Sequence, residues 1–89
     1  MASAWQWYPG LAPRWRQYGD EVLVFNNLSG DTHLLSADAM LVLDALRHGA
    51  RARAALIAAL GVEDAADAAA LDALLAQLVS HHLLAQAPC

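Results

Sequence analysis

Residues 21–46, EVLVFNNLSGDTHLLSADAMLVLDAL, restrict the fold more than any other part of the chain. The first of them alternate between the two faces of a β-strand, and a turn rich in Asn, Ser, Gly and Asp follows. Residues 32–35 then predict a return strand, and Ser36 stands where its hydroxyl can cap a helix. A hairpin that leads directly into a helix predicts a small antiparallel sheet with an open edge, and an open edge can bind an extended peptide.

The rest of the chain extends this pattern in both directions. Residues 14–18 predict a preceding strand, because the Gly19-Asp20 turn separates them from the next one. Helices are expected over about 37–48, 51–60 and 63–80, and the last has the most regular leucine stripe. The fold class is therefore α+β, with a three-stranded antiparallel sheet followed by a three-helix bundle, as in winged-helix proteins.

The ends of the chain are expected to lie outside this domain, which we assign to residues 14–85. Residues 1–13 contain Trp5 and Trp7 among prolines and glycines and predict an irregular aromatic arm. Its tryptophans would pack over the sheet, or alternatively contact a partner or a second copy. Residues 86–89 are expected to be a frayed C-terminus.

Composition limits the classes of function. At 89 residues the chain is expected to form one domain, and its net charge is -4 without any lysine. This balance disfavours binding to nucleic acid, whose phosphates attract basic surfaces. The single cysteine, Cys89, cannot form an internal disulfide, which fits a reducing compartment. No segment predicts a membrane span or a signal peptide, so we expect a cytoplasmic protein that binds no membrane.

The order of strands and helices resembles the PqqD-type peptide chaperones of bacteria, also called RiPP recognition elements. Residues 22–46, VLVFNNLSGDTHLLSADAMLVLDAL, carry this resemblance, and residues 74–84, LLAQLVSHHLL, add to it more weakly. The sequence is most similar to the subgroup that accompanies a protein related to HPr kinase, in which an "sGdtHlLn" hairpin precedes the first helix. That hairpin reads SGDTHLLS here. His82 departs from the family, where glycine commonly follows the last helix.

The resemblance implies a non-catalytic peptide-binding role in natural product biosynthesis. A ribosomally made precursor peptide would add its leader segment as a strand beside the third strand, and would then be presented to a modifying enzyme or to the HPr-kinase-related protein. The implied strand edge comprises Asp31, Thr32, His33, Leu34 and Leu35. The implied groove wall on the third helix comprises Leu71, Leu74, Leu75 and Leu78.

Individual polar residues predict neither catalysis nor a cofactor. His33 could bond to a peptide carboxylate or, more simply, to a neighbouring turn group such as Asp31. His81 and His82 are adjacent and have no acidic or thiol partner nearby in the sequence, which makes a poor metal site. The chain has no evident carboxylate pair, phosphate loop or activated nucleophile, so we expect no enzymatic activity and no bound metal.

Two other functions remain open from the sequence. A winged-helix DNA-binding protein would also combine a small sheet with helices, but the expected third helix carries only acidic charge. A structural subunit could instead dock on a partner enzyme through residues 1–13. The cluster of Arg47, Arg51 and Arg53 could contact DNA or an acidic partner, or could simply be a solvated helix end. The open edge could also pair two copies into a homodimer.

Overall fold

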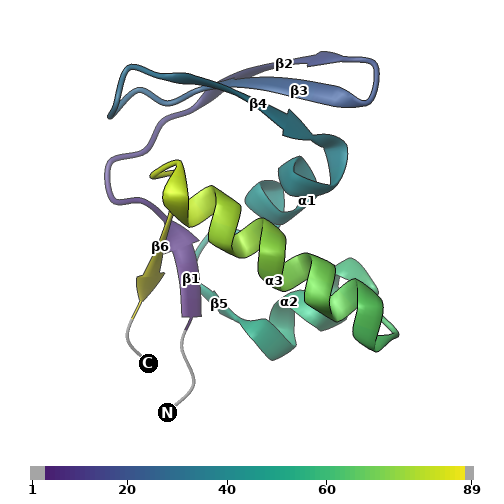
Figure 1. Cartoon of the computed structure of the whole chain (residues 1–89). Helices are drawn as coiled ribbons and strands as arrows, with labels where there is room; N and C mark the ends of the chain where they lie inside the picture. Colours follow the sequence, from purple (N-terminus) through teal and green to yellow (C-terminus); the bar gives the residue numbers. More distant parts are fainter. Residues whose placement is uncertain (1–3, 88–89) are drawn as a thin grey trace.

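Strands β2 (Arg14–Tyr18), β3 (Glu21–Phe25) and β4 (Thr32–Ser36) form an antiparallel sheet in that order in the computed structural model, which describes residues 4–87 (Figure 1). Val22 and Val24 point into the core, whereas Leu23 and Phe25 lie on the outer face. This alternation is what a half-buried strand requires. The expected three-stranded sheet and the α+β class are confirmed.

Helix α1 (Ala37–Ala45) begins where β4 ends. The Ser36 hydroxyl caps it, because Oγ accepts a hydrogen bond of 3.1 Å from the Ala39 backbone N–H. The helix ends three residues before the expected His48, since the Leu46 N–H turns back to the Leu43 carbonyl in a tighter last turn. Its buried face consists of Ala39, Val42, Leu43 and Leu46.

Helices α2 (Arg53–Leu60) and α3 (Ala65–Ser80) complete the bundle, and both begin two residues later than the sequence predicts. The start of α3 is set by Asp64, whose carboxylate accepts a hydrogen bond of 2.8 Å from the Asp67 N–H. Gly61 ends α2 in the left-handed conformation, with φ 68°. Helix α3 packs against α1 and buries Leu71, Leu75 and Leu78.

A second sheet joins residues 4–7 to residues 84–87, and the sequence pattern did not predict it. Its order is β5 (Arg51–Ala52), β1 (Ala4–Trp7) and β6 (Leu84–Ala87), and it lies at the opposite end of the domain from β2–β4 (Figure 1). The expectation of an irregular arm over residues 1–13 is therefore wrong for residues 4–7. The expected frayed end is likewise wrong for residues 86 and 87, whereas Cys89 lies outside the described residues.

The tryptophans of β1 pack against the core, and Trp7 also bonds to helix α1. The indole Nε1 of Trp7 donates a hydrogen bond of 2.7 Å to the Leu43 carbonyl of α1, and Trp5 and Trp7 both contact the core. Antiparallel pairing of Trp7 with Leu84 brings the end of the chain to the same place. A tryptophan that buries its ring and satisfies its N–H stabilises such a junction well.

Asn26 is the one buried polar residue among the described residues, and it links the hairpin to α3. Its side-chain Nδ2 donates to the carbonyls of His81 and His82 at 3.1 and 3.2 Å. Its Oδ1 accepts from the N–H groups of Leu28 and Ser29 at 2.8 and 3.2 Å. The side chain thus has partners for its donors and its acceptor, as burial of an amide requires.

We predict that Asn26→Ala lowers the free energy of unfolding by about 2–4 kcal/mol, because it leaves several backbone groups without partners in a buried place. Asn26→Asp should cost a similar amount, since its carboxylate would face the two carbonyls that Nδ2 now contacts. Urea unfolding followed by circular dichroism measures both changes.

Asn27→Ala is the matched control, because Asn27 also makes side-chain hydrogen bonds, to Gly10 and Ala12, but is exposed. We expect it to cost no more than about 1 kcal/mol. Equal losses at the two positions would contradict the role assigned to Asn26.

Candidate functional site

Strand β4 is an edge strand, and its hydrogen-bonding pattern shows which backbone groups are free. Two hydrogen bonds just beyond the ends of the β3–β4 ladder show which residue pairs are hydrogen-bonded. The Asn26 N–H donates to the Asp31 carbonyl at 2.8 Å, and the Ala37 N–H donates to the Asp20 carbonyl at 3.1 Å. Bonded and non-bonded pairs alternate along an antiparallel ladder. His33 and Leu35 therefore direct their backbone groups towards β3.

Thr32 and Leu34 direct their N–H and C=O groups away from β3. No strand among residues 4–87 pairs with this side of β4 (Figure 1). Of the five residues predicted for the edge, these two thus offer free backbone groups, while Leu35 is buried. Asp31 lies before β4, and its carbonyl is occupied by Asn26.

The two faces of β4 present different side chains to anything that lies beside it. Thr32 and Leu34 are on the outer face, and Leu34 is 57% exposed. Leu23 and Phe25 of β3 lie beside them on the same face and are each more than a third exposed. The other face presents His33, because Leu35 has almost no accessible surface.

The ring of His33 stacks on that of His81, at the end of α3. The ring centroids are 4.1 Å apart and the planes are inclined by 26°. The Nε2 of His33 is buried without a hydrogen-bond partner among the described residues, so this nitrogen does not make the predicted bond to Asp31. No group of three or more His, Cys, Asp or Glu side chains within residues 4–87 is placed to hold a metal ion.

His81 and His82 point in different directions, as adjacent residues must. His82 has φ 59° and its ring forms a T-shaped pair with that of Tyr8, while His81 faces His33. Burial lowers the pKa of His81, and the neighbouring His33 and His82 lower it further. The stacked pair therefore favours a neutral His81.

The four leucines predicted for the groove wall divide into two groups. Leu71, Leu75 and Leu78 are buried in the core and have at most 3% of their surface exposed. Leu74 is half-buried, and together with Leu71 it lines a pocket between α1 and α3. The stripe is thus mainly core, and only its first half reaches an accessible cavity.

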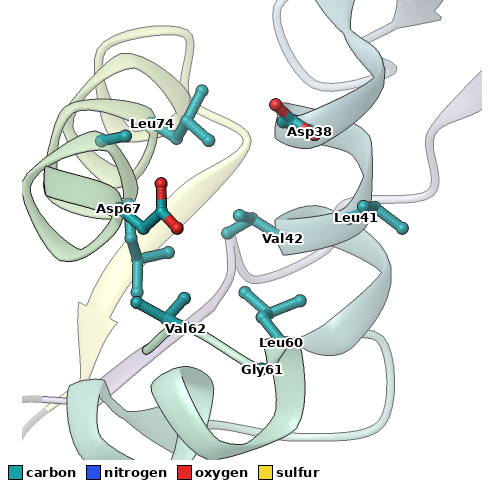
Figure 2. A pocket seen from close by; sticks show the side chains of 10 residues that line it. Asp38, Leu41, Val42, Leu60, Gly61, Val62, Asp67 and Leu74 are labelled. Carbon is teal, nitrogen blue, oxygen red and sulfur yellow. The ribbon is translucent and has the colours of Figure 1, made fainter. Parts of the chain in front are cut away.

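This pocket has a volume of about 260 Å³ and lies between α1, α3 and the end of α2 (Figure 2). Apolar side chains from all three elements and the following loop form its walls, namely Leu41, Val42, Leu60, Val62, Leu71 and Leu74. Asp38 and Asp67 stand on opposite sides, one on each helix. This pocket was not predicted from the sequence, although the spacing of Asp38, Leu41 and Val42 places them on one side of a helix.

Two of the three arginines grouped by the sequence form ion pairs in the structure. Arg47 forms an ion pair of 2.9 Å with Asp44 and lies over the ring of Trp15, at 4.9 Å from its centroid. Arg53 binds Asp72 of α3 at 2.8 Å through a two-point contact. Two of the three predicted cluster members are therefore already paired with acids.

Comparison of the chain with protein family models, with curated proteins and with solved structures found no match. The resemblance to PqqD-type chaperones therefore stays a prediction from the residues. Within residues 4–87, no helix is long and apolar enough to cross a membrane.

We predict that the chain loses stability as the pH falls from about 7.5 to about 5.5, and that His81→Phe removes part of this loss. The pKa of His81 is lower in the folded chain, so below its ordinary value the unfolded state binds the proton more readily. Phenylalanine keeps a ring against His33 but cannot be protonated. Urea unfolding at several pH values measures the difference.

His48→Gln is the matched control, since His48 is exposed in the turn after α1. We expect it to leave the pH dependence unchanged. An identical dependence in the parent chain and in His81→Phe would contradict the lowered pKa of His81.

Proposed function

We propose that this chain is a non-catalytic peptide-binding protein of the PqqD type. It would recognise the leader segment of a ribosomally made precursor peptide by strand addition along β4 and present it to a modifying enzyme, such as the HPr-kinase-related protein that the resemblance implies. The open edge of β4, with the free backbone groups of Thr32 and Leu34, is the observation that carries this proposal.

The short edge limits what backbone pairing contributes. Each hydrogen bond adds only about 1 kcal/mol net, so a few of them supply a minor part of the roughly 8–12 kcal/mol that micromolar to nanomolar binding requires. Apolar side chains of the peptide must supply much of the rest. Leu34 and the neighbouring Leu23 and Phe25 offer exposed apolar surface for them.

The alternative of a winged-helix DNA-binding protein has less support. A recognition helix needs basic side chains that reach the phosphates and bases. The exposed face of α3 instead carries Asp67 and Asp72, and the arginine beside it, Arg53, is paired with Asp72. We therefore propose no nucleic-acid partner.

The alternative of a subunit that docks through its N-terminus also has less support. Residues 4–7 form β1, which pairs with both β5 and β6. Deletion of residues 1–13 would remove this strand and the hydrogen bond from Trp7 to α1. Such a deletion should unfold the second sheet, so it cannot separate docking from folding.

Peptide binding is tested by titrating the isotope-labelled full chain with precursor peptides encoded beside its gene, observed by amide NMR. We predict shifts centred on Thr32 and Leu34. We further predict that Leu34→Pro weakens binding roughly five- to tenfold, because proline removes an edge-facing N–H donor. Since that N–H is not part of the β3–β4 ladder, the variant should stay folded.

Leu34→Ala is the matched control, because it shortens the same side chain but keeps the N–H group. We expect it to weaken binding less than Leu34→Pro does. Binding that is insensitive to Leu34→Pro, or shifts confined to Trp5 and Trp7, would exclude strand addition on β4.

A further inference from the structure

The pocket between α1 and α3 has the size and chemistry of a side-chain site. Its volume of about 260 Å³ is below the roughly 300–1,000 Å³ of small-molecule sites, so it suits one large apolar side chain better than a cofactor. Leu41, Leu60, Val62 and Leu74 are exposed or half-buried around it. An apolar group placed there would remove these side chains from water.

Two carboxylates give this apolar pocket a charge preference. Asp38 of α1 and Asp67 of α3 are both exposed at its rim and face the space between the helices (Figure 2). Among residues 4–87, neither carboxylate has an ion-pair or hydrogen-bond partner, whereas Asp44 and Asp72 are held by arginines. No basic side chain lines the pocket. A cation at the rim would therefore meet two unpaired negative charges.

The pocket lies close to the C-terminal end of the open strand edge of β4. Asp38 follows the last residue of β4, Ser36, by two positions, so the pocket lies beyond the end of that strand. Helix α3 borders both places, because His81 at its end stacks on His33 of β4 while Asp67 and Leu74 line the pocket. A peptide that pairs with β4 and continues past Ser36 is directed towards Asp38, which lines the pocket.

We infer that this pocket selects peptides in which a large apolar residue stands next to arginine or lysine, an inference that rests on the proposed function. The apolar side chain occupies the cavity among Leu41, Val62 and Leu74, and the cation lies between Asp38 and Asp67. Backbone pairing along β4 depends little on the sequence of the peptide. Recognition of the apolar-basic pair therefore determines the specificity of the site.

Asp38 and Asp67 also have a structural role that could explain their positions without any peptide. Asp38 and Asp67 each lie in the first turn of a helix, where a negative charge stabilises the helix dipole. That role predicts a small loss of stability when they are neutralised. It predicts no change in the kind of peptide that is bound.

The test uses the isotope-labelled full chain and three synthetic peptides with blocked ends. All share a central Thr-Val-Thr-Val-Thr segment, which favours an extended strand. The first is flanked on both sides by a Leu and an outer Arg, so that either strand direction brings one pair to the pocket. The second replaces both Arg by Glu, and the third replaces both Leu by Ser.

We expect the Leu-Arg peptide to bind most tightly, with amide shifts at Thr32 and Leu34 and also around Asp38 and Leu74. Asp38→Asn/Asp67→Asn should weaken it roughly three- to tenfold and reduce its preference over the Leu-Glu peptide. The double variant Glu21→Gln/Glu63→Gln changes the net charge equally at exposed acids that do not line the pocket, and should leave the preference unchanged. Thermal unfolding checks that each variant is folded.

The outcomes separate this inference from the proposed function. Equal binding of the three peptides with shifts along β4 would overturn the pocket inference and leave strand addition standing. A Leu-Arg preference with shifts at the pocket but none along β4 would support the pocket and overturn strand addition. No shift at either place with millimolar peptide, or equal effects of the two double variants, would overturn the inference.

Discussion

The side chain of Asn26 holds the hairpin against the end of α3, and the rest of the structure depends on this connection. Its amide reaches the carbonyls of His81 and His82, more than fifty residues away in the chain, while its oxygen organises the turn at Leu28 and Ser29. A buried amide is tolerated only when such partners are present, so the turn and the helix end stabilise each other. The left-handed conformation of His82 then directs the chain towards Leu83 and Leu84, both of which are buried.

This connection also determines the geometry of the candidate site. The backbone of Asn26 bonds to Asp31 and thereby sets the register of β4, which leaves Thr32 and Leu34 as the residues with outward-facing backbone groups. The side-chain amide of Asn26 contacts the His81 carbonyl, and the ring of His81 stacks on His33 of β4. The buried side chain of Asn26 thus links the β3–β4 hairpin to α3, the helix that borders the pocket. The two parts of the proposed peptide site are therefore fixed relative to each other by the core, as precise recognition requires.

Much of the fold could be predicted because the signals are local. Ser36 caps α1 as its position indicates, and the alternation of Val22 and Val24 with Leu23 and Phe25 gives the correct faces. The missed features depend on distant partners. The strand that contains Trp5 and Trp7 exists because it pairs with β5 and β6, and its short sequence has no period of its own. The leucine stripe predicted a helix face, but whether Leu74 or Leu78 is accessible depends on what packs against α3.

The sequence by itself determined the β2–β4 meander, the three helices and the entry from β4 into α1. These elements follow from turn residues, caps and periodicity, which act between residues close in the chain. Only the tertiary structure decided that Asn26 is buried, that Asp38 and Asp67 face one pocket, and that residues 4–7 and 84–87 share a sheet. Each of these depends on contacts between segments far apart in sequence, and no local pattern encodes which surfaces will meet.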